Sequence, residues 1–419
     1  MPSPIFVEFR MTDRNISIQC TETAFLDDLM GKLEKLLPML ERDENLRLFQ
    51  ALHSNIIQEI EWSEKLDARQ SVLLDRIVET DDYPSLLEIH EALNELEMER
   101  FIKIQSVSSL HKNCTRYRDR LIHRALFLVD REMEHIGKGS PPVTFALISM
   151  GSDGRGEQTL ITDQDHLIVY KDNGGAAADE YFKGFSEIIV ERLAAIGFKK
   201  CTGDIMPVNP TWRGSYTQWR KKLLAIVRYE YEDYAKNLMD LIVLSDARYV
   251  AGDQQLAELL IELIRGLEQD YFQALWGMAK AATEMKLALG FMKRLWTEGS
   301  GEHKGEFNLK LLAWAPLVMN VRILAINQGV PATNTVRRIE LLQEEKSFSA
   351  VTANGLKDAY QTLTRQRILL QIKVIKGVQK DSYYLNPYNL STDERERIRQ
   401  ALLRIEELQK MIHTNFSIM

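Results

Sequence analysis

Cysteine is scarce in this chain, with three residues in 419, and this excludes a fold held together by disulfide bonds. Cys20, Cys114 and Cys201 form no Cys-x-x-Cys pair and cannot all be paired, which fits a reducing compartment. The first residues, MPSPIFVEFRMTDRN, lack the apolar stretch of a secretory signal. No run of about 18 apolar residues is present to span a bilayer. We therefore expect a cytoplasmic protein without a membrane partner.

The chain also lacks a strong charge of one sign and the signatures of several enzyme classes. Its 53 Lys and Arg residues against 60 Asp and Glu residues give a formal net charge of −7, which disfavours a nucleic-acid partner. There is no GxxxxGK[ST], HExxH or GxSxG motif, and no Cys and His spacing typical of zinc sites. Hydrophobic residues at 45% and charged residues at 27% are ordinary for a globular protein. The length favours two or three domains.

Helical patterns occupy both ends of the chain. From about residue 21 to residue 135, segments such as FLDDLMGKLEKLLPMLE and LLEIHEALNELEMERFIKI repeat apolar residues at spacings of three and four. We expect a helical region over residues 1–137. The segment GKGSPP, residues 137–142, breaks helices and is the expected boundary. Helical periodicity returns near residue 254, so we expect a C-terminal helical bundle over residues 256–419.

Between these helical regions, residues 138–255 alternate short apolar runs with turns. VTFALISM and HLIVY predict two strands, and the segment NLMDLIVLSDARYVAGD contains a third. A helix is expected over residues 179–198, ending at Gly197 as a C-cap. The predicted fold is therefore α+β and predominantly helical, with a small mixed sheet in the middle domain.

The segment GSDGRGEQTLITDQD, residues 151–165, lies between the first two predicted strands. Its glycines let the backbone turn sharply and approach a ligand closely. Ser152 and exposed amides could then cradle phosphate oxygens, and Arg155 could neutralise their charge. Glycine-rich loops of this kind are more often simple tight turns, so the turn alone is weak evidence.

Two acids follow this turn. Asp163 and Asp165 flank Gln164 at the start of a strand, where alternate residues point to one face. Like charges that close raise each other's pKa unless a cation lies between them, so the pair suggests Mg²⁺, with Mn²⁺ as an alternative. The plainer alternative is a solvated strand end that carries two acids.

These motifs resemble the nucleotidyltransferase superfamily whose catalytic fold is that of DNA polymerase beta, and more closely the nucleotidyltransferases related to the PII-protein uridylyltransferase. The family usually reads Gly-Ser-Glu-Gly-Arg, and here Asp153 takes the Glu position. Downstream, GDIMPVNPTWRGSYTQWR and SDARYVAGD resemble two further family segments, and the tail GEFNLKLLAWAPLVMNVRILAINQGVPATNTVRRIELL resembles the helical substrate-binding domain. The resemblance runs from about residue 141 to the end. No CBS sensor pair precedes the motif.

The resemblance implies metal-dependent transfer of a nucleoside monophosphate, UMP or AMP, from a nucleoside triphosphate to a protein or small-molecule acceptor. Asp163 and Asp165 would be the metal ligands, and Gly151 and Ser152 would hold the triphosphate with Arg155 as a charge partner. A third carboxylate normally completes such a site. Asp246 is our choice for it, because it matches the family's Asp-x-Arg segment.

Asp240 is the competitor for this third carboxylate, since it would share a face with Asp246 in one unbroken strand. The resemblance adds further candidate nucleotide-binding residues: Asn209, Trp212, Arg213 and Lys310. Trp212 could equally pack its loop onto the core. The tail also contributes Arg322, Asn334, Thr335 and Arg338, which could bind nucleotide or acceptor but which are more often surface groups.

Two functions of different classes remain open. The first is an active nucleotidyltransferase, and the alternative is a non-catalytic nucleotide-binding or scaffold protein that retains the fold. The intact set of Ser152, Asp163, Asp165 and Asp246 favours the first. Long amphipathic helices could also pair across a homodimer interface.

Overall fold

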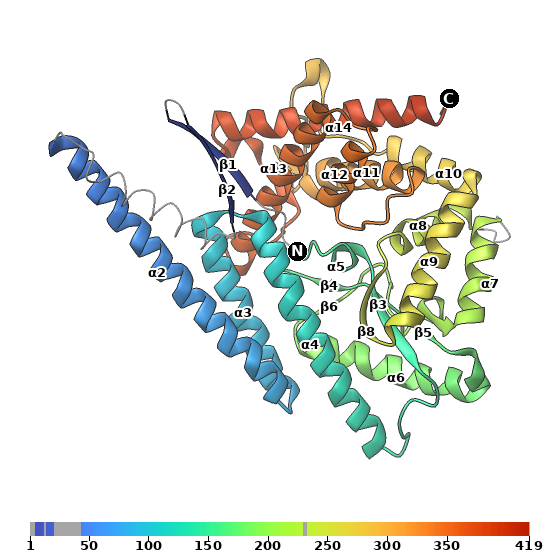
Figure 1. The fold of residues 1–419 in the computed structure, drawn as a ribbon. Coiled ribbons are helices and arrows are strands. Elements are labelled where there is room, and N and C mark those ends of the chain that lie inside the picture. Colours follow the sequence, from blue (N-terminus) through green and yellow to red (C-terminus); the bar gives the residue numbers. More distant parts are fainter. Residues whose placement is uncertain (1–4, 12–13, 21–42, 229–232, 419) are drawn as a thin grey trace. The chain divides into compact units, whose positions relative to one another are not determined.

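The computed structural model of the protein describes residues 5–11, 14–20, 43–228 and 233–418. The chain forms two compact units, divided between Arg76 and Ile77. The fold is α+β and predominantly helical, as expected from the sequence, and Figure 1 shows its elements.

The first unit contains a hairpin and most of a long helix. Strand β1 (Ile5–Met11) pairs antiparallel with β2 (Arg14–Cys20). Only helices were expected here, so the hairpin corrects the prediction; its sequence alternates apolar and polar residues with the period of two that strands require. Helix α2 (Asp43–Glu79) follows. The helix predicted over residues 25–41 lies outside the described residues.

The second unit begins with two helices that pack against the sheet domain. Helix α3 (Tyr83–Ile104) starts at Asp82, whose carboxylate accepts a hydrogen bond from the Ser85 amide at 2.8 Å. Helix α4 (Val107–His135) packs against α3, against helix α6 (Gly175–Ala195) and against the sheet strand β8 (Arg248–Gly252). Residues 137–142, the predicted boundary, therefore separate α4 from the first strand of the sheet within one compact unit.

A four-stranded mixed sheet forms the centre of this unit, in the order β7, β5, β3, β8. Its strands are β3 (Phe145–Ser149), β5 (His166–Tyr170), β7 (Arg213–Ser215) and β8 (Arg248–Gly252). Strand β3 is antiparallel to β5 and β8, and β5 is parallel to β7. The first two strands confirm the predictions made from VTFALISM and HLIVY, and their apolar side chains are buried.

A second, parallel pair of short strands lies next to the glycine-rich turn. Strand β4 (Asp163–Gln164) pairs with β6 (Lys199–Lys200), with Asp163 opposite Lys199 and Gln164 opposite Lys200. Helix α6 (Gly175–Ala195) connects β5 to β6 and ends just before Gly197, whose φ of 98° favours glycine.

Helix α8 (Tyr234–Leu244) occupies much of the segment in which a third strand was predicted. Leu238, Leu241 and Ile242 are buried, and their spacing of three and four is that of a helix face. The strand of this segment, β8, begins only at Arg248. Asp246 therefore precedes the strand and does not end it.

Asp240 lies on helix α8, so it shares no strand face with Asp246. Asp240 was a candidate for the third carboxylate only if the whole segment formed one unbroken strand. The segment does not form one.

The remaining helices of the unit pack against the sheet or form the C-terminal bundle. They are α7 (Tyr216–Val227), α9 (Gln254–Asp270), α10 (Phe272–Thr283), α11 (Ala315–Asn327), α12 (Thr335–Glu344), α13 (Ala350–Ile375) and α14 (Thr392–Asn415). Helix α9 packs against β3, β5 and β8, and α10, α11, α13 and α14 pack against one another. A π-helical turn, Lys310–Trp314, precedes α11, and β9 (Phe307–Asn308) pairs with β10 (Tyr384–Leu385).

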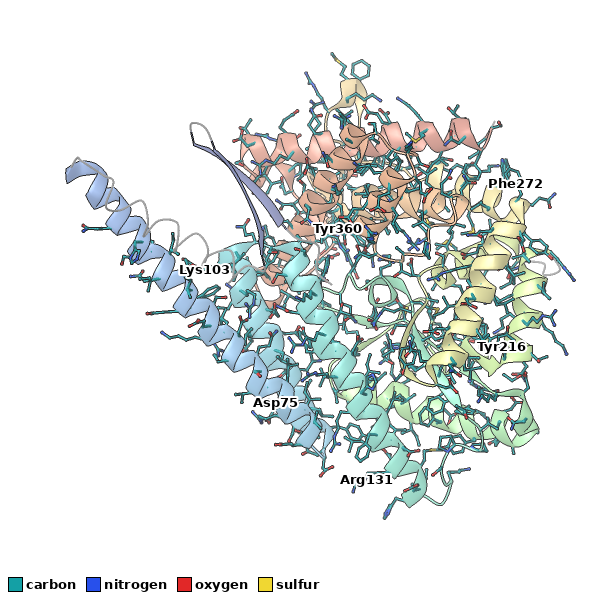
Figure 2. All side chains as sticks on the ribbon, viewed as in Figure 1. Asp75, Lys103, Arg131, Tyr216, Phe272 and Tyr360 are labelled. Carbon is teal, nitrogen blue, oxygen red and sulfur yellow. The ribbon has the colours of Figure 1, made fainter. Side chains whose placement is uncertain are left out.

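The stretch Lys310–Asn327 is long and apolar enough to cross a membrane by length and composition alone, but 72% of it is buried inside the protein. The stretch is thus a core helix of the bundle. Figure 2 labels Tyr360 on the neighbouring helix α13, and the hydroxyl of this side chain lies 3.1 Å from Nε2 of His111 on α4.

Candidate active site

The glycine-rich turn begins directly where strand β3 ends. Helix α5 (Gly151–Gly154) is a single turn, and Gly151 has φ of 58°, a conformation that L side chains rarely adopt. A Cβ atom on Gly151 would lie 2.3 Å from Oδ2 of Asp165. The backbone of the turn is therefore pressed against the second acid of the pair. Ser152, the next residue, is half-buried, and no described residue accepts or donates a hydrogen bond at its hydroxyl.

Asp163 and Asp165 come together as predicted, and a thiol joins them. Ligand atoms of Asp163, Asp165 and Cys201 all lie within 4.8 Å of one another. Oδ1 of Asp165 is buried and has no hydrogen-bond partner among the described residues. Burial and the neighbouring charge of Asp163 raise the pKa of Asp165 to about 6. Two close carboxylates with an unpaired buried oxygen fit a bound divalent cation, which would supply the missing charge.

Lys310 approaches this pair from the C-terminal domain. Burial and the charge of Arg367 lower the pKa of Lys310, while the carboxylates of Asp163 and Asp165 act in the opposite direction. The Lys310 ammonium also lies 5.0 Å from the centre of the Tyr383 ring. It sits in the π-helical turn, and such turns are frequent at functional sites. The structure thus brings a cation of the helical domain towards the two acids.

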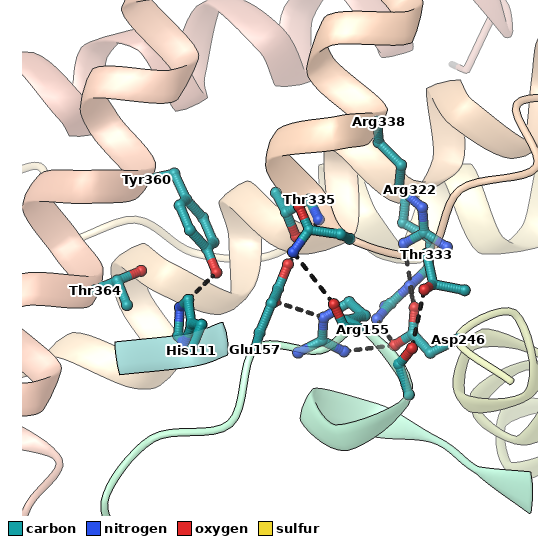
Figure 3. Close-up of polar contacts among 12 residues, drawn as sticks. His111, Arg155, Glu157, Asp246, Arg322, Thr333, Thr335, Arg338, Tyr360 and Thr364 are labelled. Atoms are coloured by element: carbon teal, nitrogen blue, oxygen red, sulfur yellow. Dashed lines mark hydrogen bonds and ion pairs between the residues drawn. The ribbon is translucent and has the colours of Figure 1, made fainter. Parts of the chain in front are cut away.

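Arg155 lies in a buried network of charges, drawn in Figure 3. Its Nε donates to Glu157 at 2.8 Å and its Nη1 donates to Asp246 at 2.5 Å. The side chain is only 5% exposed. The predicted contact between Arg155 and a phosphate therefore has no support in this geometry, because both of its polar edges face carboxylates of the protein.

Asp246 is the centre of the buried network. Its carboxylate accepts hydrogen bonds from Arg155, from Arg322 and, at 3.1 Å, from Arg338. Burial alone would raise the pKa of Asp246, but the charges of Arg322, Arg155 and Arg338 hold it below its usual range. The structure does not bring Asp246 to Asp163 and Asp165, so the predicted third metal ligand is a structural carboxylate. Arg322 and Arg338 are likewise engaged with Asp246 and are not surface groups.

The same network joins the glycine-rich turn to the start of helix α12. The Thr333 hydroxyl donates to the Gly154 carbonyl at 2.9 Å, and Nδ2 of Asn334 donates to the Arg155 carbonyl at 3.2 Å. The Thr335 amide donates to Oε1 of Glu157 at 2.6 Å. Asn334 and Thr335, predicted as ligand contacts, therefore hold the turn. We refer to Arg155, Glu157, Asp246, Arg322, Arg338 and residues 333–335 as the interdomain clamp.

Asp153, which stands where the family usually has Glu, is also buried. Ser149 donates to it at 2.6 Å and Arg248 at 2.7 Å, and Nε2 of His166 lies 3.4 Å away. Burial alone would raise the pKa of Asp153, but His166, Arg248 and Ser149 lower it. This carboxylate ties the turn to strands β3, β5 and β8.

The Asn-Pro-x-Trp-Arg loop has structural contacts. Asn209 accepts from the Thr211 amide at 2.9 Å and donates to Asp204. Trp212 is only 3% exposed, with its ring 6.5 Å from that of Trp219. Base stacking by Trp212 is thus not supported, and the alternative of packing onto the core is.

Arg213 donates to the backbone carbonyls of Pro207 and Val208. It also lines a surface hollow of about 420 Å³ together with Lys183 and Lys222. Neither Asp163 nor Asp165 lines that hollow. Arg213 therefore lies apart from the acid pair.

Cys201 is the residue of the site that sequence reasoning missed. It follows β6 immediately, and β6 runs parallel to β4, with Gln164 opposite Lys200. No local pattern indicates this pairing, because residues 165–198, 34 residues that include all of α6, lie between the two strands. The family-like segment that follows, GDIMPVNPTWR, was the available signal that this loop approaches the site.

Two family models match the chain. The model described as "Putative nucleotidyltransferase DUF294" matches residues 88–233, and the model described as "Putative nucleotidyltransferase substrate binding domain" matches residues 272–416. The first includes the glycine-rich turn, both acids and Cys201, and the second includes Lys310 and the clamp residues of α11 and α12. None of the curated proteins compared with the chain matches it.

Proposed function

The chain belongs to the nucleotidyltransferase family that these two models describe, and on this premise we propose that it transfers a nucleoside monophosphate from a nucleoside triphosphate to an acceptor. The donors we propose are UTP or ATP, with Mg²⁺ or Mn²⁺ as the metal. The acceptor would be a protein side chain or a small molecule, bound in the cytoplasm by the C-terminal helical domain.

The observation that carries this proposal is the convergence of three unlike groups on one place. The carboxylates of Asp163 and Asp165 lie together, the turn at Gly151 is pressed against Asp165, and Lys310 of the helical domain lies near enough for the charges of both acids to act on its pKa. Acids for metal, a turn with free amides for phosphate and a cation for charge are the parts that phosphoryl chemistry needs. A solvated strand end would not bury an unpaired carboxylate oxygen.

In the proposed reaction, each part of the site acts on the triphosphate. The amides at the start of α5 and the Ser152 hydroxyl bind phosphate oxygens, since helix starts leave amides free to donate. Lys310 offsets negative charge on the phosphates from the side of the helical domain. A divalent cation held by Asp163 and Asp165 would neutralise charge on the transferred phosphate when bound. The interdomain clamp holds the glycine-rich turn at a fixed position relative to the helical domain that carries Lys310. In-line transfer requires such fixed positions of the reacting groups.

The test is the fate of the α-phosphate. The protein would be incubated with UTP or ATP labelled at the α- or the γ-phosphate, Mg²⁺, and size-fractionated cell extract. The proposal predicts that label from the α-phosphate enters the acceptor fraction and that label from the γ-phosphate leaves as pyrophosphate. In the double variant Asp163→Asn with Asp165→Asn, no α-label should enter the acceptor fraction and no γ-label should leave as pyrophosphate. Transfer of the γ-label would indicate a phosphotransferase, and nucleotide binding without transfer of either label would favour the non-catalytic alternative.

A further inference from the structure

The acid pair would need a third metal ligand, and no carboxylate of the interdomain clamp lies beside it. Cys201 lies beside the pair instead. The parallel register of β4 and β6 sets Gln164 opposite Lys200, and Asp165 and Cys201 are the next residues of the two chains. The thiol, Asp163 and Asp165 all have ligand atoms within 4.8 Å of one another. In the described part of the chain, this is the one group of three such side chains close enough to share an ion.

The Cys201 thiol hydrogen-bonds to the Asp165 carboxylate, and burial together with the charge of Asp165 raises the pKa of the thiol to about 12, so a cation that binds sulfur has to displace the thiol proton. Oδ1 of Asp165 is buried and has no hydrogen-bond partner among the described residues, so one lone-pair direction of the carboxylate is unused. Oδ2 of the same carboxylate lies against the backbone of Gly151, which restricts rotation of the group. Asp165 is therefore held in place with one oxygen that no described residue satisfies and that a bound cation could use.

The other acid considered for this position is committed elsewhere. Asp246 accepts hydrogen bonds from three arginines, and removing it from them would leave buried cations uncompensated. A thiolate also differs chemically from a third carboxylate, because sulfur is a soft ligand and Mg²⁺ is a hard cation. The identity of the third ligand thus determines which metals the site prefers.

We propose that the thiolate of Cys201 is the third protein ligand of this site, and that the site therefore binds Mn²⁺, Co²⁺ or Zn²⁺ more tightly than Mg²⁺. This inference rests on the proposed function for the identity of the acid pair as metal ligands. On binding, the thiol proton leaves to solvent and sulfur donates to the cation, so no redox step is involved. Zn²⁺, which thiolates favour strongly, competes with Mg²⁺ at this site and makes it sensitive to zinc.

The experiment is titration of the full-length protein with Co²⁺, followed by absorption spectroscopy. Wild type should show a sulfur-to-cobalt charge-transfer band in the near ultraviolet. The band should persist in Cys114→Ala, a buried cysteine on α4 away from the cluster, and should disappear in Cys201→Ala. Calorimetry should give a loss of Zn²⁺ affinity of at least about tenfold in Cys201→Ala and no such loss in Cys114→Ala.

The outcomes separate this inference from the proposed function. Absence of the band in wild type that binds Co²⁺, or equal Zn²⁺ affinity in wild type and Cys201→Ala, would overturn the ligand assignment even if Mg²⁺-dependent triphosphate binding stands. Loss of the band in Cys201→Ala, with a wild-type circular dichroism spectrum and denaturant midpoint to show that the variant is folded, supports it. Failure of wild type to bind any of these cations would overturn both.

Discussion

Gly151 is the residue at which the backbone and the chemistry of the site constrain each other most. Its positive φ lets the chain leave β3 and enter α5, and its missing side chain leaves room for Oδ2 of Asp165. Any other residue would have to adopt a conformation that costs about 1–2 kcal/mol and would also displace the carboxylate. The turn and the acid pair are thus one structural unit.

Gly151→Ala should lower both stability and ligand binding. We expect unfolding free energy to fall by at least about 1 kcal/mol, because of the positive φ and the overlap at 2.3 Å. Displacement of Asp165 should also weaken Mg²⁺-dependent triphosphate binding. Denaturant unfolding and calorimetry measure the two effects. The matched control is Gly184→Ala in helix α6, where a Cβ meets nothing within 4 Å and should stabilise by about 0.5–1 kcal/mol. Equal effects of the two substitutions would contradict this account.

Residue-level predictions succeeded where the pattern was local. The spacing of Asp163 and Asp165 at the start of a strand predicts that they meet, and they do. The position of Cys201 depends on a parallel pairing across helix α6, which no local pattern specifies. Arg155 and Asp246 are charged residues of family-like motifs, so they were predicted as ligands. In the structure they are surrounded by arginines and loop residues of the helical domain.

At the scale of elements, the interdomain clamp joins the sheet domain to helices α11 and α12. Asp246 follows α8 in the chain, Arg322 lies on α11 and Arg338 on α12, with the hydrogen bonds spanning 76 to 92 residues of sequence. Arg338 also donates to the Ser245 carbonyl at 3.0 Å. Because every donor and acceptor here is buried, removal of one partner leaves an uncompensated charge, which is strongly unfavourable.

Asp246→Asn should destabilise the protein by about 3–5 kcal/mol, because three buried arginines then lose their shared anion. Denaturant unfolding monitored by circular dichroism measures this directly. Asp240→Asn on helix α8 is the matched control. Burial raises the pKa of Asp240, so folding does not stabilise its carboxylate relative to the unfolded chain, and the change should cost less than about 1 kcal/mol. A small effect at Asp246 would show that the clamp does not contribute to stability.

The helices and strands were predicted best in segments where a single hydrophobic period, that of a helix or that of a strand, dominates. Strands β3 and β5 and helix α6 match their predicted positions. The segment before Asp246 was assigned to a strand because it is short and apolar, a case in which helix and strand are hard to distinguish by composition. The cap at Asp233, whose side chain accepts from the Lys236 amide at 3.0 Å, favours the helix. The clamp could not be predicted, because no sequence period links residues so far apart.

At the scale of the whole molecule, the interior contains more charge than a typical core. Glu268 on α9 is 2% exposed, and its Oε1 has no hydrogen-bond partner among the described residues. Burial raises its pKa to about 8, an effect that Arg338 opposes and Asp246 reinforces. The carboxyl is therefore neutral in the folded protein at neutral pH.

Glu268→Gln should remove a pH dependence of stability. The folded-state pKa of Glu268, about 8, lies above its ordinary value of 4.5, so its contribution is complete below 4.5 and is lost as pH rises through 8. Wild type should lose at most about 1.4 kcal/mol per pH unit from this group over that range. Urea unfolding of both proteins between pH 5 and pH 8 measures the difference. The account expects the variant to be the more stable protein at pH 8, and a difference that does not change with pH would contradict it.

The central claim is that Asp163 and Asp165 form a metal site that binds a nucleoside triphosphate. The most direct measurement is calorimetry of UTP and ATP binding with and without Mg²⁺, in wild type and in Asp163→Asn with Asp165→Asn, with Asp240→Asn as the control. We predict Mg²⁺-dependent binding of one triphosphate in wild type and in the control, and its loss in the double variant. Absence of triphosphate binding in folded wild-type protein, or equal binding in the double variant, would contradict the claim.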